Sequence, residues 1–336
     1  MSLILSFESS CDDTSVAILD TDYRVLVNLI SSQPEHLDFG GVLPELASRL
    51  HMKNIMHLTE LALQKAELKL KDIDAIAVSI NPGLIGSLIV GLSFAKSLAW
   101  SLEKPLVTVN HLLSHVFANY IDHPDLEPPF LALVVSGGHT ELVHFRTDTE
   151  FEVVGKTLDD AAGETFDKAA KLMGLGFPGG PIIDRLAQGG DPSFVKLPNP
   201  LPQKDNYNFS YSGMKTAIRS YIMDQSSEHL EKHQRDIAAS IQAAIVNPLI
   251  QKSLRKASDL GVQQILIAGG VAANSALRTG LVSKAKARKI DVYYPSLKLC
   301  MDNAAMVAAA AIPKFKAGLY AELGVNATSV KGTRLL

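Results

Sequence analysis

The sequence predicts an α/β protein built from two related domains. Short apolar segments rich in Val, Ile and Leu alternate with longer segments whose apolar residues recur at helical spacing. The same order, two strands around a polar loop and then a third strand, begins at residue 3 and again at residue 130. Between these two stretches, residues 122–129 are polar and proline-rich, as is typical of a linker. We therefore expect two halves of one fold that face each other across a cleft.

The composition is that of an ordinary globular protein. The 336 residues suit two domains, and 47% of them are hydrophobic while 20% are charged. The formal net charge of -3 gives no signature of a dedicated nucleic-acid binder. Two cysteines, Cys11 and Cys300, indicate a reducing compartment. No apolar run reaches membrane-spanning length, and Glu8 interrupts the apolar N-terminus. We expect a soluble cytoplasmic protein with no membrane partner.

The first stretch predicts three strands at residues 3–7, 14–19 and 24–30, with the loop ESSCDD between the first two. Acidic residues in such a loop either hold a hydrated Mg²⁺ or orient a phosphate, or they form a solvated turn with local hydrogen bonds. Apolar spacing then predicts a helix over residues 44–67, with His51 and His57 on its surface.

A glycine loop follows the next buried strand. Residues 73–80 form this strand, and NPGLIGS at residues 81–87 leads into a helix that ends near residue 102. A strand, a glycine loop and a helix together can cradle an anion, because free N–H groups and the helix dipole point at one spot. The alternative is that a tight strand-to-helix turn needs glycine whatever it binds.

Two histidines open the helix after the strand at residues 105–109. Asn110 suits the N-cap position, and His111 and His115 lie one turn apart, so both imidazoles can reach one ion at about 2.0–2.2 Å. Carboxyl ends of strands are where open α/β sheets place ligands. The alternative is a pair of polar residues that caps a helix, and His229 and His233, which have the same spacing among charged neighbours, are predicted to form such a solvated face. No Glu follows His111, which excludes the HExxH type of zinc peptidase.

The second stretch predicts strands at residues 130–135, 140–145 and 151–156, the first two joined by SGGH. A helix is expected over residues 159–173, then the segment GLGFPGGP, and a second helix over residues 182–187. An irregular segment follows at 190–212, then a helix with Lys215 and Arg219, and two long helices to about residue 260.

The last part of the chain repeats the strand, glycine turn and helix unit. Residues 264–268 form the strand, and GGVAAN leads into the helix. A strand at 292–294 and a loop at 295–301 precede an alanine-rich helix, which we expect Pro313 to interrupt. The predicted boundaries are 1–127 for the first domain, 128–310 for the second, and 311–336 for a segment that packs back on the first.

Ten segments occur in an order that resembles one protein family. They are SFESSCDDTSVAIL, PELASRLH, NPGLIGSLIVG, VNHLLSHVFA, VVSGGHTELV, DDAAGETFDK, GFPGGP, FSYSGMKT, IAGGVAANS and MDNAAM. Together they resemble the TsaD family, bacterial relatives of the archaeal and eukaryotic Kae proteins that were once called O-sialoglycoprotein endopeptidases. The resemblance covers nearly the whole chain. It implies two RNase H-like domains of the ASKHA group (acetate kinase, sugar kinase, Hsp70 and actin) with an interdomain cleft.

The resemblance also implies an activity and its residues. Members transfer the threonylcarbamoyl group of threonylcarbamoyl-AMP to N6 of adenosine 37 in tRNAs that read ANN codons, and AMP is released. By motif, one Fe²⁺ or Zn²⁺ is expected on His111, His115 and Asp302, and Asp12 matches a position associated with activity. The residues expected to bind the substrate are Val134, Val135, Ser136, Gly137, Gly138, Asp167, Gly180, Asp184 and Asn274. The implied partners are tRNA, the paralogous subunit TsaB and the ATPase TsaE, which brings Mg²⁺ and ATP.

Several residues keep two interpretations. Asp302, read without the resemblance, is an N-cap, and His139 either contacts the substrate or fastens its turn. Asp13 and Asn81 stand where family members often have Glu and Gly, so a role for Asp13 is open. Cys11 is expected to be structural, because a mixed-anhydride donor needs no covalent nucleophile. For tRNA, the candidates are the basic residues Lys215, Arg219, Lys284, Lys286, Arg288 and Lys289.

Three other functions compete with the transferase. A small-molecule kinase or ATPase of the ASKHA group uses the same glycine loops with Mg²⁺ at the acidic loop. A metallopeptidase is the older description of the family, against which the missing Glu after His111 argues. A non-catalytic scaffold of a tRNA-modifying complex is the third.

Overall fold

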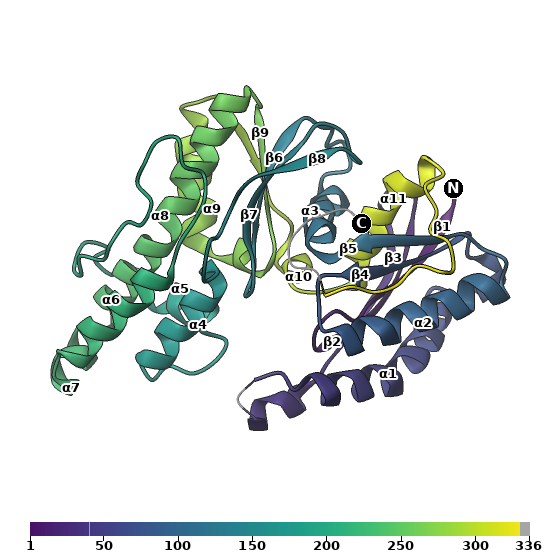
Figure 1. Ribbon diagram of the computed structural model, residues 1–336, viewed down its shortest axis with the longest axis horizontal. Helices are drawn as coiled ribbons and strands as arrows, with labels where there is room; N and C mark the ends of the chain where they lie inside the picture. Colours follow the sequence, from purple (N-terminus) through teal and green to yellow (C-terminus); the bar gives the residue numbers. More distant parts are fainter. Residues whose placement is uncertain (40, 330–336) are drawn as a thin grey trace. The chain divides into compact units, whose positions relative to one another are not determined.

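The computed structural model describes residues 1–39 and 41–329, which fall into two compact units (Figure 1). The first unit combines Met1–Leu126 with the chain from Pro295 onward, and the second is Glu127–Tyr294. The predicted boundary at 127/128 lies within one residue of this division. The chain returns to the first unit at Pro295 and not at 311, so Asp302 belongs to the same unit as the two histidines. Residues 330–336 of the predicted C-terminal segment lie outside the described residues.

The first unit contains a five-stranded mixed sheet in the order β3-β2-β1-β4-β5. Its strands are β1 (Leu3–Glu8), β2 (Asp13–Asp20), β3 (Val25–Ser32), β4 (Ala75–Asn81) and β5 (Leu106–Asn110). Strands β1, β2 and β3 form an antiparallel meander, while β4 pairs with β1 and β5 with β4 in parallel. The predicted strands are confirmed, with ends shifted by one or two residues.

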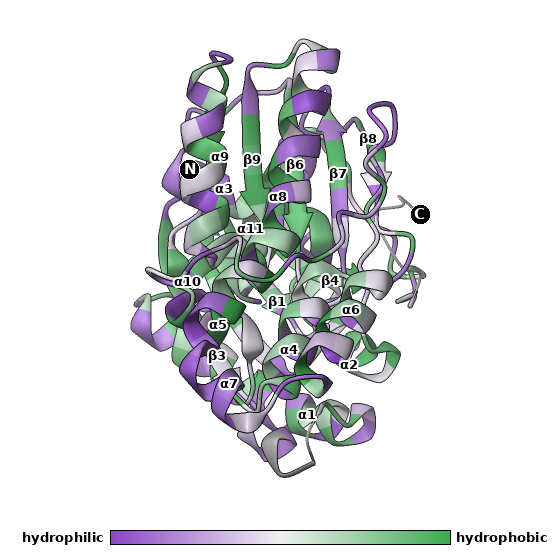
Figure 2. Cartoon of the chain, turned by 90° about the vertical axis from the view of Figure 1, so that its left-hand side faces the viewer, coloured by the Kyte–Doolittle hydropathy of each residue, from purple (hydrophilic) through white to green (hydrophobic). Residues whose placement is uncertain are grey.

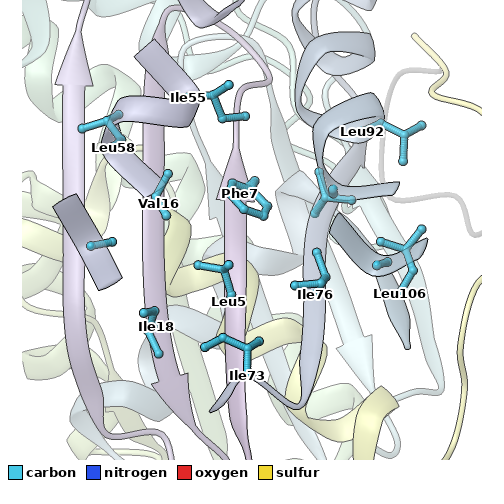
Figure 3. Packing of buried hydrophobic residues seen from close by; sticks show 14 of the residues in the cluster. Leu5, Phe7, Val16, Ile18, Ile55, Leu58, Ile73, Ile76, Leu92 and Leu106 are labelled. Atoms are coloured by element: carbon cyan, nitrogen blue, oxygen red, sulfur yellow. The ribbon is translucent and has the colours of Figure 1, made fainter. Parts of the chain in front are cut away.

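Side chains of β1 alternate between the two faces of this sheet, as the pleat requires. Leu5 and Phe7 point into the core beneath α1 (Pro44–Lys65) and α2 (Ile85–Ser101), and they belong to the same buried cluster as Ile55 and Leu92 (Figure 3). The opposite face carries α11 (Ala304–Lys316), with α3 (His111–Asp122) packed against it. Ser6, on this second face, donates from Oγ to the carbonyl oxygen of Ala304 at 2.7 Å.

Helix α11 lies close to the sheet because its buried residues are mostly alanines, which add little thickness between helix and strands. Pro313 was expected to interrupt this helix, and that expectation is wrong, since the helix continues to Lys316. Only one turn follows the proline, so few hydrogen bonds are lost. The Lys314 ammonium donates to the carbonyl oxygen of Thr108 at 2.8 Å and holds that last turn on β5.

The second unit repeats the sheet order of the first. Its strands are β6 (Phe130–Val135), β7 (Thr140–Phe145), β8 (Phe151–Lys156), β9 (Gln264–Ala268) and β10 (Asp291–Tyr293), in the order β10-β9-β6-β7-β8. Each sheet therefore has an antiparallel meander of three strands, and the first strand of the meander pairs with two further parallel strands in succession. Figure 2 colours much of β7 and β9 hydrophobic, as expected for strands covered by helices. The predicted duplication is confirmed.

Six helices belong to the second unit. They are α4 (Ala162–Leu172), α5 (Gly179–Leu186), α6 (Ser212–Met223), α7 (Ser227–Lys232), α8 (Gln234–Leu260) and α9 (Ser275–Lys286). Helix α4 begins three residues later than predicted, because Asp159 instead binds the segment before α6: its Oδ1 accepts from the backbone N–H of Tyr211 at 2.7 Å. Two long helices were expected before residue 260, but only α8 is long, with 27 residues, and α7 has six.

Short elements complete the chain: the 3₁₀ turns η1 (Pro34–Phe39), η2 (Leu70–Asp72) and η3 (Gly270–Ala273), and the single turn α10 (Leu297–Cys300) within the predicted loop at 295–301. Over the described residues, every helix is too short or too polar to cross a bilayer.

Candidate metal centre

The two histidines enter the site from the start of α3. Strand β5 ends at Asn110, whose side chain accepts a hydrogen bond from the backbone N–H of Leu113 at 3.1 Å and so acts as the predicted N-cap. His111 and His115 then lie one turn apart, and both are buried. Their rings meet edge to face, with centroids 4.9 Å apart and an interplanar angle of 80°. The helix therefore presents two imidazoles at one point, as the sequence predicts.

Asp302 supplies a carboxylate at the same point. Its Oδ1 lies 3.1 Å from Nε2 of His115 and 3.6 Å from Nε2 of His111. One ligand atom from each residue lies within 4.8 Å of the other two, and in the described part of the chain this is the one group of its kind. Asp302 does not cap α11, because Asn303 does so by accepting from the N–H of Met306 at 3.0 Å. The interpretation of Asp302 as an N-cap is thus wrong.

The charges of His111, Glu8 and Asp302 shift one another's pKa values. Burial alone lowers the pKa of His111, but the carboxylates of Glu8 and Asp302 outweigh it and raise the pKa to about 9. Burial likewise disfavours the Asp302 carboxylate, yet the adjacent histidines hold its pKa well below the ordinary value. A pair of carboxylates around buried imidazoles attracts positive charge. Two nitrogen donors and one oxygen donor also match the ligand sets of Zn²⁺ and Fe²⁺, so the residues fit a divalent metal.

Glu8 is a site residue that the sequence interpretation missed. It is 1% exposed, and its Oε2 lies 3.1 Å from Nδ1 of His111, on the side of the ring away from Asp302. The alternation of β1 contains the signal, since Glu8 follows Ser6 on the face that carries α3 and α11. An ionisable side chain that points to the buried face of a strand needs a hydrogen-bonding or charged partner there.

The acidic loop after β1 folds against α1. His51 was expected on the helix surface, and this is wrong: it is fully buried, its Nε2 donates to the carbonyl oxygen of Cys11 at 3.0 Å, and its Nδ1 lies 2.8 Å from Thr14 Oγ1. Helical spacing could not reveal a partner in a loop 40 residues away. His57, in contrast, is exposed as expected.

The titratable groups of this loop have shifted pKa values. Burial, followed by the charge of Asp12, raises the pKa of the Cys11 thiol far above its usual value, which agrees with a structural cysteine. Burial and the nearby carboxylates raise the pKa of Asp13 to about 6, against a lowering by its hydrogen bond with Ser32. Asp12 and Asp13 are both partly exposed. Asp302 also contributes to the shift of Asp13, so the loop lies within electrostatic reach of the candidate ligands.

The glycine loop after β4 packs on the acidic loop. The N–H of Leu84 donates to the carbonyl oxygen of Ser10 at 2.8 Å, and a Cβ at Gly83 would lie only 2.6 Å from that oxygen. Close packing therefore explains this glycine, which favours the structural alternative over the anion cradle.

In the second unit, five of the predicted substrate residues, Val134 to Gly138, lie at the end of β6 and in the turn that follows it. Val134 and Val135 end the strand, and the turn of Ser136, Gly137 and Gly138 rests on the first turn of α4. The N–H of Gly163 donates to Ser136 O at 3.2 Å. Within the turn, Ser136 N donates to His139 O at 2.9 Å, and His139 N donates to Ser136 Oγ at 3.2 Å. The backbone of His139 thus fastens the turn.

A second loop closes on the same end of β6. Gly269 follows β9 with φ of 87°, and a Cβ there would lie 2.5 Å from Val135 O, so this position requires glycine for both reasons.

The remaining predicted substrate residues join neighbouring helices of that unit. Asp167 accepts from the N–H of Gly179 at 2.7 Å, next to Gly180. Asp184 accepts from Ser275 N at 3.1 Å and Ser275 Oγ at 2.7 Å. Asn274 caps α9 and donates to Gln242 Oε1 at 2.8 Å. Hydrogen bonds thus connect Asp167 on α4, Gly180 and Asp184 on α5, and Asn274 at the start of α9. Their binding of an adenosine stays a prediction.

Other predicted residues have local partners. His229 and His233 lie on a partly exposed face. Phe194 covers part of it by stacking on His233 with centroids 4.7 Å apart, and His229 packs on His233 at the same distance. Lys215 binds Asp160 at 2.6 Å. Arg288 donates to Leu254 O at 3.2 Å. Contacts to tRNA by the basic residues stay a prediction.

Fold and site together define a class of protein. Two α/β units with the same sheet order resemble solved ASKHA-type structures, and one unit carries two buried histidines beside the partly exposed Asp302. Full-length HypF in its phosphate- and nucleotide-bound form superimposes with a TM-score of 0.63 at 14% identity, over 95% of this chain and 47% of HypF. Component A of the Acidaminococcus fermentans (R)-2-hydroxyglutaryl-CoA dehydratase gives 0.55 at 15% identity, over 94% and 99% of the two chains. These likenesses confirm the ASKHA fold.

Sequence similarity identifies the family within that class. The family model of TsaD, tRNA N6-adenosine threonylcarbamoyltransferase, matches residues 24–309. A protein of that description from Thermosipho africanus is 47% identical over 326 residues, covering 97% of this chain and 98% of the relative. One from Clostridioides difficile is also 47% identical over 326 residues, covering 97% and 96%. The chain belongs to the TsaD family, as its motifs predicted.

Proposed function

We propose that this protein transfers the threonylcarbamoyl group of threonylcarbamoyl-AMP to N6 of adenosine 37 in tRNAs that read ANN codons. The adenine amine forms a bond to the carbamoyl carbon, the bond from that carbon to the phosphate oxygen breaks, and AMP leaves while the amine loses a proton. Membership of the TsaD family supports this reaction. The observation that carries the proposal is the convergence of His111, His115 and Asp302 in a chain of this family.

One divalent ion, Fe²⁺ or Zn²⁺, is proposed on those three side chains, where it would supply Lewis acidity towards the carbonyl of the donor. The protein supplies the alignment of amine and carbonyl, since the anhydride donor is already activated. Cys11 takes no covalent part, in agreement with its raised pKa. Asp12 is proposed to assist catalysis from the acidic loop, where a carboxylate suits proton removal from the amine.

The second unit is proposed to hold the rest of the donor. The turn of Val134, Val135, Ser136, Gly137 and Gly138 offers backbone groups, while Asp167, Gly180, Asp184 and Asn274 are proposed to bind the adenosine part. Carboxylates suit this task because a ribose hydroxyl donates to them. Their present hydrogen bonds to Gly179 and Ser275 fix the carboxylate planes in advance.

The proposed macromolecular partners are tRNA, a TsaB-like subunit and a TsaE-like ATPase that brings Mg²⁺ and ATP. The net charge of -3 supports a subunit that binds tRNA jointly with others, since it provides little attraction for RNA by itself. A cytoplasmic location is proposed with it, and the two free cysteines agree with a reducing compartment.

The proposal is tested by a transfer assay with the partner subunits, synthetic threonylcarbamoyl-AMP and unmodified tRNA, read as the modified nucleoside by mass spectrometry. We expect product with the wild type and a loss of at least a hundredfold with His115→Ala. His57→Ala, at an exposed position on α1, is the matched control and should retain full activity. A His115→Ala complex that assembles and still transfers would favour the scaffold alternative. Phosphoryl transfer from ATP to a small molecule by this chain alone would favour the kinase.

A further inference from the structure

We infer that Glu8 is a positioning residue that fixes the tautomer and ring orientation of His111, so that Nε2 of that histidine is presented as the ligand atom. This inference rests on the metal site within the proposed function and adds a residue that acts through His111 without reaching the metal or the substrate. The evidence is the pair of contacts that the Glu8 carboxylate makes, one with each oxygen.

The first contact determines which nitrogen of His111 carries the hydrogen. Oε2 of Glu8 lies 3.1 Å from Nδ1 of His111, and Oε1 accepts from the backbone N–H of Ser10 at 2.6 Å. An ionised carboxylate only accepts hydrogen bonds, so the Nδ1 facing it must be the donor. In the neutral ring the lone pair is then on Nε2, the atom that points to Asp302. Ser10 Oγ, 3.1 Å from Nδ1, is compatible with that tautomer because a hydroxyl also accepts.

The second contact makes the arrangement rigid. Because Ser10 N–H holds Oε1, the carboxylate cannot rotate away from the ring without leaving a buried N–H unpaired. Glu8 is the last residue of β1 and is 1% exposed, so its backbone is also held by the sheet. A carboxylate behind a ligating imidazole is the arrangement that orients such ligands and raises their basicity in metal sites.

His115 lacks the corresponding support. Its Nδ1 is buried and has no hydrogen-bond partner among the described residues. Of the two imidazoles, only that of His111 therefore has a carboxylate at Nδ1. Glu8 also adds a second negative charge to that of Asp302, and the two charges together balance those of a divalent ion. Glu8 thus contributes to the affinity of the site by supporting His111.

Glu8→Gln is the sharpest variant, because it keeps the shape and removes one acceptor. If the amide oxygen faces Ser10 N–H, the amide NH₂ faces His111 and forces Nδ1 to accept, which places the hydrogen on Nε2. If the amide is reversed, its NH₂ opposes the N–H of Ser10. Either arrangement impairs the site. Glu141→Gln, which changes another buried glutamate in the other compact unit, is the matched control.

The experiment measures Zn²⁺ dissociation constants of the full-length protein by competition with a chromophoric chelator. We expect a 10- to 100-fold weaker affinity for Glu8→Gln, the range found for loss of such supporting groups, and an unchanged value for Glu141→Gln. Nitrogen-15 spectra of the histidine side chains in the Zn²⁺-loaded protein should show hydrogen on Nδ1 and the metal on Nε2 of His111 in the wild type, and this pattern should be lost in Glu8→Gln. Equal affinity and an unchanged tautomer in Glu8→Gln would overturn the inference.

Glu8→Asp provides a second variant if Glu8→Gln folds poorly. It keeps the charge but withdraws the carboxylate by about one methylene, so we expect an affinity between those of the wild type and Glu8→Gln. An affinity equal to the wild type in both variants would count against the inference. A wild type that binds Zn²⁺ in a manner that depends on Glu8, yet transfers nothing to tRNA, would refute the proposed function and leave the role of Glu8 supported.

Discussion

Nε2 of His51 lies 3.0 Å from the carbonyl oxygen of Cys11, and this contact joins α1 to the loop that carries Asp12. A carbonyl only accepts, so the hydrogen is on Nε2, and Nδ1 accepts from the hydroxyl of Thr14 at 2.8 Å. The side-chain nitrogen Nε2 of Gln33 also approaches that Nδ1, at 3.5 Å. One neutral imidazole thus ties the acidic loop to the helix.

Replacing His51 should therefore loosen the acidic loop. His51→Leu leaves Cys11 O and Thr14 Oγ1 without this partner, and we expect a loss of about 1–3 kcal/mol in the free energy of unfolding. Transfer activity should fall through a lower kcat, because Asp12 loses its fixed position. Urea denaturation and steady-state kinetics provide the measurements. His57→Leu, an exposed position on the same helix, is the control, and equal effects of the two changes would contradict this role.

The same histidine should make stability depend on pH. Burial lowers the pKa of His51 below its ordinary 6.5, so the unfolded state binds more protons than the folded state in acid. Its contribution should be constant above about pH 6.5 and should decrease as the pH falls below that value. The difference in unfolding free energy between wild type and His51→Gln, measured from pH 5 to 8, isolates this contribution. A difference that does not change across that range would contradict the buried neutral state.

The thiol of Cys11 should be unreactive in the folded protein. Burial and the charge of Asp12 raise its pKa, and only the thiolate reacts rapidly. Cys300 is buried, and Cys11 is only partly exposed. Intact mass after iodoacetamide at pH 8 should therefore show no adduct on the native protein and adducts on both cysteines after denaturation. Cys11→Ala should retain transfer activity. Rapid native alkylation of Cys11, or loss of activity in Cys11→Ala with normal folding, would revive a nucleophilic role.

Asp159 should be needed to order the segment before α6. Although burial raises its pKa, hydrogen bonds from Ser210, Tyr211 and Ser212 outweigh this effect and lower it. Asp159→Ala should therefore accelerate hydrogen exchange at the amides of Tyr211 and Ser212, whose N–H groups bind Asp159 Oδ1 at 2.7 and 3.2 Å. Asp224→Ala, at the exposed end of the same helix, should leave both amides protected. Unchanged exchange in Asp159→Ala would show that other contacts order this segment.

Local patterns predicted the fold almost completely. The strands at residues 130–135, 140–145, 151–156 and 264–268 have the predicted ends, since alternation and bounding polar turns are local properties. The repeated meander predicted the shared sheet order, and Asn110 predicted the start of α3. Asp302 was predicted to join the two histidines only from the family resemblance. The residues around Asp302 in the sequence do not indicate a contact with a segment that lies so far earlier in the chain.

The errors concern contacts between distant segments. His51 was placed on a helix surface because the helical pattern does not contain the loop that covers it. Glu8 was overlooked because an acidic residue at a strand end is ordinarily solvated, and only its partner on α3 explains its burial. The predicted cleft between the domains stays a prediction, as do the roles of Asp12 and of the substrate residues.

The account depends most directly on a metal held by three named side chains. Anomalous diffraction from crystals of the Zn²⁺-loaded protein, recorded above and below the zinc edge, locates that ion without reference to activity. We predict one strong peak about 2.0–2.2 Å from Nε2 of His111, Nε2 of His115 and a carboxylate oxygen of Asp302. A fully loaded protein whose zinc peak lies on other residues, with these three side chains unliganded, would contradict the account.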